Sequence, residues 1–107
     1  MREPRKVERR EAPGPAQGVR APDPAGELAL LVRARRVLLA DPARTLALTE
    51  QHLRDYPQGA FAEEREVLAI ESLVRTGEKE RARARMQRFA SGFPNSTHLS
   101  RIRALLE

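Results

Sequence analysis

The sequence predicts an all-α protein of about five helices that pair into antiparallel hairpins. Three observations predict this class. From residue 27 onward, apolar residues recur every three or four positions, which is the period of a helix with one buried face. Prolines and glycines interrupt these segments at intervals that suit helix ends. Part of the pattern also returns after 37 positions, which is typical of stacked helix pairs.

Residues 1–26 differ in composition from the rest of the chain. They hold five of the eight prolines and three of the six glycines, and the stretch EAPGPAQGVRAPDPAG has no apolar period. Such a segment buries too little apolar surface to offset the entropy lost on ordering. We therefore predict a disordered proline- and glycine-rich linker over 1–26 and a helical domain over 27–107.

The first predicted hairpin joins helices over residues 27–40 and 42–55. Asp41 and Pro42 separate them, since aspartate suits an N-cap and proline suits the first helical position. Pro57 ends the second helix. The apolar face of the first helix is broad, and the stripe of the second includes a polar residue: Leu28, Leu31, Val32, Leu38 and Leu39, then Leu46, Thr49, Leu53 and Tyr56.

The second predicted hairpin joins helices over residues 60–76 and 78–91, and a fifth helix starts at Ser96 as its N-cap. Gly77 and Gly92 are predicted as the left-handed residues that close the third and fourth helices. Each of the three helices has one apolar face. These faces consist of Val67, Ile70, Leu73 and Val74, then Ala82, Met86, Phe89 and Phe93, and finally Leu99, Ile102, Leu105 and Leu106.

Both hairpins end in the same way. The stretch 55–57 returns as 92–94, with an aromatic residue followed by a proline in each copy. The alternative interpretation is a coincidence between two amphipathic helices. Because the aromatic residue and the proline recur in register, the pattern favours a repeated helix pair.

These residues resemble those of a known family. Ala82, Met86, Phe89 and Pro94 resemble the second half of a tetratricopeptide repeat, with small, large and large residues before a terminal proline. The phrase FxxxFPNS over 89–96 is similar to the helix ends of BamD-like outer-membrane assembly proteins and Tol-Pal-associated periplasmic repeat proteins. The layout also resembles repeat-like C-terminal segments of bacterial membrane-anchored regulators. The resemblance implies an α-solenoid fragment over about 27–107.

The same resemblance implies where a partner binds. Peptides in that family mostly contact the first helix of each pair, which places candidate groove positions at Arg33, Arg36, Glu66 and Ser72. The chain departs from the family pattern because its period exceeds the usual length of about 34 residues. It also lacks the Trp/Leu-Gly-Tyr signature of the first helix.

The sequence offers no set of residues for catalysis. It has no cysteine, no glycine-rich phosphate loop and no serine in a nucleophile elbow. His52 and His98 lack carboxylate or thiolate neighbours at ligand spacing. His52 shares the register of Phe89, which favours a partly buried or rim histidine over a metal ligand. We predict no enzymatic activity, no cofactor and no metal.

Arg81, Arg85 and Arg88 form a candidate basic strip on the fourth helix. One interpretation is a solvated helix face, and the other is a surface for an acidic peptide, phosphate or nucleic-acid backbone. The formal net charge of +5 is spread along the chain. The four aromatic residues are all assigned to helix ends or to the apolar stripe, so none is free to stack on bases.

The sequence therefore predicts a non-catalytic interaction or scaffold module that binds a protein or peptide through its helical groove. The first alternative is a small basic accessory protein that holds nucleic acid through arginines. The second is a detached periplasmic module of an envelope or signalling protein, which an in-frame membrane span upstream of Met1 would favour. As written, the chain has no signal peptide or apolar span, which predicts a soluble cytoplasmic protein without membrane insertion. We expect marginal stability as a monomer, with homodimerisation through an exposed apolar groove.

Overall fold

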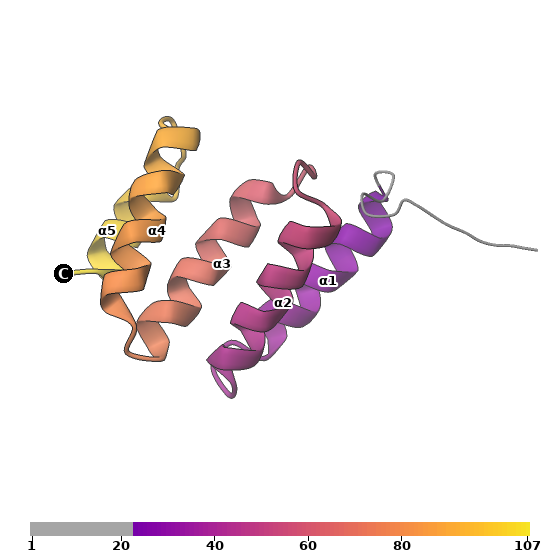
Figure 1. Ribbon diagram of the computed structural model, residues 1–107, viewed down its shortest axis with the longest axis horizontal. Helices are drawn as coiled ribbons and strands as arrows, with labels where there is room; N and C mark the ends of the chain where they lie inside the picture. The colour runs from indigo at the N-terminus through magenta and orange to yellow at the C-terminus, as the bar shows by residue number, and fades with distance from the viewer. Residues whose placement is uncertain (1–22) are drawn as a thin grey trace, which may run out of the picture.

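The computed structural model describes residues 23–107, and over these residues the chain consists of helices without a strand. The all-α prediction is confirmed. Figure 1 shows α1 to α4 in a row with alternating directions, and α5 behind α4 in this view. Their bounds are α1 Pro24–Arg36, α2 Pro42–Asp55, α3 Ala62–Arg75, α4 Lys79–Gly92 and α5 Leu99–Leu105.

The start of α1 lies inside the segment predicted as a linker. Residues 1–22 lie outside the described part of the chain, and Pro24 occupies the first turn of α1. Asp23 and Pro24 form the same Asp-Pro pair that precedes α2, and the backbone oxygen of Asp23 accepts from Glu27 N at 2.9 Å. The helical domain therefore begins three residues earlier than composition alone indicates.

Two of the predicted helix ends are confirmed by their geometry. The Asp41 side chain accepts a hydrogen bond from Arg44 N at 3.0 Å and so caps α2, with proline following it. Gly77 has a φ of 81°, and Glu78 N reaches back to Leu73 O at 2.8 Å. Glycine permits this left-handed turn because it has no Cβ.

Two other predicted boundaries are wrong. Gly92 is the last residue of α4 rather than a left-handed cap; the cap is Phe93, at a φ of −131°. Phe93 turns out of the helix there, and its ring lies 5.2 Å from that of Phe89. The fifth helix begins at Leu99, three residues later than predicted, because the Ser96 hydroxyl accepts from His98 N and supports the turn before the helix.

The 37-residue period is also present in the structure. Helix α2 spans residues 42–55 and α4 spans residues 79–92, so both of their ends repeat after 37 positions. Helices α3 and α5 begin at residues 62 and 99, with the same offset. The two caps share their backbone conformation, with φ and ψ of −136° and 60° at Tyr56 and −131° and 65° at Phe93. The sequence repeat is therefore a structural repeat of helix boundaries.

Helix α3 is the central element, since it packs against α1, α2, α4 and α5. Its residues 67–73 are all buried. One apolar cluster joins α3 to α4 and α5, and the other joins α3 to α1 and α2. The first contains Val67, Ile70, Leu73, Ala82, Phe89, Leu99, Ile102 and Leu106, and the second contains Leu30, Leu31, Ala34, Leu38, Leu48, Tyr56 and Leu68.

Candidate functional site

An open apolar hollow of about 210 Å³ lies between α1 and α3, and we call it the α1/α3 groove. Its floor includes the buried side chains of Leu31 and Leu68. Leu28 and Val32 stand at its α1 side with 47% and 41% of their surfaces exposed. The lining residues are Leu28, Leu31, Val32 and Arg35 from α1, then Phe61, Glu64 and Leu68 from α3 and its N-cap.

Helical spacing explains why these residues share the groove. Residues 28, 31, 32 and 35 fall on one face of α1, and residues 61, 64 and 68 fall on one face of α3. The two helices run in the same direction in Figure 1. Glu64, in the first turn of α3, therefore lies toward one end of the groove, and Arg35, in the last turn of α1, lies toward the other.

The charges at the two ends of the groove are not neutralised locally. Within residues 23–107, neither Arg35 nor Glu64 takes part in a hydrogen bond or ion pair with another side chain. Both residues are exposed. An apolar floor flanked by one free cation and one free anion can bind an apolar side chain and orient its carrier electrostatically.

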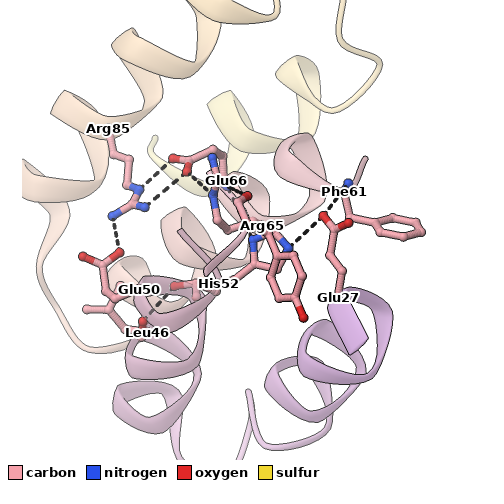
Figure 2. Close-up of polar contacts among 10 residues, drawn as sticks. Glu27, Leu46, Glu50, His52, Phe61, Arg65, Glu66 and Arg85 are labelled. Atoms are coloured by element: carbon pink, nitrogen blue, oxygen red, sulfur yellow. Dashed lines mark hydrogen bonds and ion pairs between the residues drawn. The ribbon is translucent and has the colours of Figure 1, made fainter. Parts of the chain in front are cut away.

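Buried Glu27 holds one wall of the groove in place, as Figure 2 shows. Its carboxyl oxygens accept hydrogen bonds from Phe61 N at 2.9 Å and from Ala60 N at 3.2 Å. A Cβ at Gly59 would overlap the Glu27 carboxyl group, so glycine allows this close approach of the loop. Glu27 thus ties α1 to the loop that presents Phe61.

His52 connects Glu27 to α3. It is fully buried, with Nε2 3.0 Å from Glu27 Oε2 and Nδ1 3.4 Å from Arg65 Nη1. Burial lowers the pKa of His52, the hydrogen bond to Glu27 opposes this shift, and the charge of Arg65 adds to it. A neutral imidazole that donates from Nε2 to Glu27 and accepts at Nδ1 from Arg65 satisfies both contacts.

A second polar cluster joins α2, α3 and α4 (Figure 2). Glu66 accepts from Arg65 Nε and from Arg85 Nε, each at 2.8 Å, and Arg85 also lies 3.1 Å from Glu50. Burial would raise the pKa of Glu66, but the hydrogen bonds from Arg85 and Arg65 hold it below its usual value. Arg85 thus pairs with carboxylates of α2 and α3, and the side chains of Arg65, Glu66 and Arg85 are largely removed from solvent, whereas Glu50 stays partly exposed.

The four predicted groove positions do not come together in the structure. Arg33 and Arg36 are exposed, but Arg33 lines a different hollow together with Asp55 of α2. The carboxylate of Glu66 is taken up by the arginine pairs. Ser72 is fully buried, and its hydroxyl donates to Ala69 O at 2.8 Å, so it has no surface with which to contact a partner.

The basic strip is interrupted at its centre. Arg81 and Arg88 are exposed, but Arg85 is buried against Glu50 and Glu66. Burial would lower the pKa of Arg85, but the hydrogen bond and charge of Glu66 raise it. The middle cation of the predicted strip therefore belongs to an internal ion-pair cluster.

Sequence reasoning missed Phe61 and Glu64 as groove residues and assigned Leu28 and Val32 to the core face. In a helical repeat, the first helix of one pair lies beside the first helix of the next pair, here α1 and α3. The repeat register could therefore have indicated that residues 28 and 32 lie near residues 61 and 64. The exposure of Leu28 and Val32 could not be predicted from the repeat register, because it depends on which helix covers that face of α1.

Within residues 23–107, His, Cys, Asp and Glu side chains form no group of three or more that could hold a metal ion. No helix in the same range is long and apolar enough to cross a membrane. Comparison of the chain with protein-family models, curated proteins and solved structures gives no match.

Proposed function

We propose that the chain is a non-catalytic interaction module, built from tetratricopeptide-like helical repeats, that binds a protein segment in the α1/α3 groove. The observation that carries this proposal is the exposure of Leu28 and Val32 above a buried apolar floor. Contiguous exposed apolar surface on a small domain marks a contact site, whereas single exposed residues do not. The groove combines several apolar residues in one hollow.

The packing around the groove supports binding without rearrangement. Helix α3 is fixed by contacts with four other helices, and the Phe61 backbone is held by the Glu27 carboxyl. A wall already fixed in place loses little conformational freedom when a partner binds. The hollow has room for one or two apolar side chains, which suits an anchor residue of a protein segment.

The nucleic-acid alternative has weaker support. Its central residue, Arg85, is paired with two carboxylates, so its charge is already compensated inside the protein. Exposed Arg81 and Arg88 remain as single surface cations. Binding of nucleic acid through these two arginines alone would be sensitive to salt, so capture at low and at high salt tests this alternative.

The test compares three tagged forms of the full chain in capture experiments from a lysate of the source organism. They are the native chain, the groove variant with Leu28→Asp and Val32→Asp, and a control with Leu53→Asp. Leu53 is 39% exposed but lies on α2, outside the groove lining. Circular dichroism of each form checks that all three fold.

The proposal predicts proteins that bind the native chain and the control at high salt and are lost from the groove variant. Equal capture by all three forms would refute it. Nucleic acid that binds all three at low salt and none at high salt would support the arginine-based alternative.

A further inference from the structure

We propose that the groove is covered by a second copy of this chain, in a two-fold symmetric dimer that packs α1 antiparallel against α1. This inference rests on the proposed function, because it names the occupant of the same groove. It follows from the order of the charges along the groove and from the placement of its two exposed apolar residues.

The charges of the groove are self-complementary. Glu64 lies toward one end and Arg35 toward the other, and neither is paired within the described residues. A two-fold axis through the middle of the groove reverses the direction of the second copy. Arg35 of each copy then faces Glu64 of the other, so a single geometric contact is formed twice.

A symmetric pair also covers the apolar residues. Leu28 and Val32 lie one helical turn apart on the exposed face of α1. In an antiparallel pair of α1 helices, Leu28 of one copy lies against Val32 of the other, and the reverse contact follows by symmetry. Helices that pack at axial distances of about 8–10 Å bring such side chains into contact.

The position of α1 in the row makes this contact accessible. Among the described helices, α1 packs mainly against α2 and α3, and Leu28 and Val32 at its groove side remain exposed. Leu28 and Val32 on this side are 47% and 41% exposed. Exposed apolar residues that share one hollow favour a partner of matching shape and charge.

The experiment uses two charge-reversal variants of the full chain, Arg35→Glu and Glu64→Arg, in sedimentation velocity over a concentration series. The native chain should dimerise. In either variant alone, both symmetric contacts bring like charges together, and the dimer dissociation constant should rise about tenfold or more.

An equimolar mixture of the two variants distinguishes this symmetric dimer from any other mode of self-association. When Arg35→Glu pairs with Glu64→Arg, the glutamate introduced in one chain faces the arginine introduced in the other. The second contact keeps the native pair of Arg35 and Glu64, so both contacts again join opposite charges. The mixture should therefore form a one-to-one heterodimer, with a dissociation constant within about threefold of the native value.

The matched control is Arg36→Glu, which reverses an exposed charge one residue outside the groove lining. This control changes the net charge by the same amount as Arg35→Glu. If the position of the charge determines dimerisation, its dimer dissociation constant should equal that of the native chain.

A native chain that stays monomeric throughout the series would overturn the inference. So would a native dimer whose single variants do not recover on mixing. A dimer that persists unchanged in the groove variant with Leu28→Asp and Val32→Asp would overturn it as well. If a monomeric chain still captures proteins in a groove-dependent way, the proposed function stands and only the second copy is wrong. If the groove variant alters neither dimerisation nor capture, both proposals fail.

Discussion

Replacing Glu27 tests the polar cluster that links α1, α2 and the groove wall. The side chain is only 3% exposed and accepts hydrogen bonds from Phe61 N, Ala60 N and His52. The change Glu27→Ala removes all three acceptor contacts and leaves an empty volume behind. The matched control is Glu64→Ala, which changes the same residue type one repeat later, at an exposed position without an ion pair in the described chain.

The size of the effect follows from the groups left behind. A buried donor without a partner costs about 1–3 kcal/mol, and Glu27→Ala leaves two backbone donors and a histidine in that state. Solvent entering near the loop compensates part of this loss, so we expect a decrease of about 3–5 kcal/mol in the free energy of unfolding. The isosteric Glu27→Gln keeps one acceptor oxygen and should lose about 1–2 kcal/mol. Glu64→Ala should stay within about 0.5 kcal/mol of the native chain.

Urea denaturation followed by circular dichroism at the helical band measures all four proteins. A small domain has limited stability, so a chain with Glu27→Ala can be unfolded even without urea. In that case Glu27→Gln gives a measurable loss in the free energy of unfolding. The reasoning is refuted if Glu27→Ala and Glu64→Ala differ by less than about 1 kcal/mol, because the buried carboxyl would then contribute no more than an exposed one.

Four further experiments test other parts of the fold by thermal or urea denaturation. Gly77→Ala should lower the free energy of unfolding by about 1–2 kcal/mol, because Gly77 has a φ of 81°. Gly92→Ala should be neutral or slightly stabilising, because Gly92 is helical and has open space around it. The reverse order of stabilities would contradict the assigned helix caps. Asp41→Ala should lose about 1 kcal/mol with the α2 cap, and an unchanged midpoint would exclude that cap. Ile102→Ala should lose about 2–5 kcal/mol, since Ile102 is fully buried against α3 and α4; a smaller loss would mean that α5 is not docked. The pKa of His52 is lowered by burial, so the unfolded chain takes up the proton at a higher pH than the folded chain does. The free energy of unfolding should be highest above pH 6.5 and fall by up to about 1.4 kcal/mol per pH unit as the pH drops below 6.5. A variant with His52→Gln that shows the same slope would exclude this histidine as the cause.

Much of the fold could be predicted because helix ends are encoded within a few residues. The Asp41 cap and the left-handed Gly77 depend on local contacts that the sequence displays directly. Gly92 misled the prediction because its residue type permits a left-handed turn but does not require one. The next residue, Phe93, packs on Phe89, and this contact set the actual end of α4.

The site was less predictable because it depends on contacts distant in sequence. His52 makes its hydrogen bond with Glu27, which reaches it from another helix and lies 25 residues earlier, so no local spacing indicates the contact. Ser72 was expected at a surface and is buried, since α3 is surrounded by four helices. Arg85 was expected in a basic strip, but Glu50 and Glu66 take up its charge.

The sequence by itself determined the all-α class, the 37-residue period and most helix ends, because apolar periodicity and caps act over one or two turns. The tertiary structure decided which residues at equivalent repeat positions are buried and which are exposed. Glu27 and Glu64 share a repeat register, yet Glu27 is enclosed by the loop before α3 while Glu64 faces solvent at the groove. Likewise, Leu28 and Val32 have the spacing of core residues but stay exposed, because α3 leaves an open groove beside α1 and no described helix covers it. Burial depends on which neighbour covers a face, and that neighbour is fixed only when the helices pack.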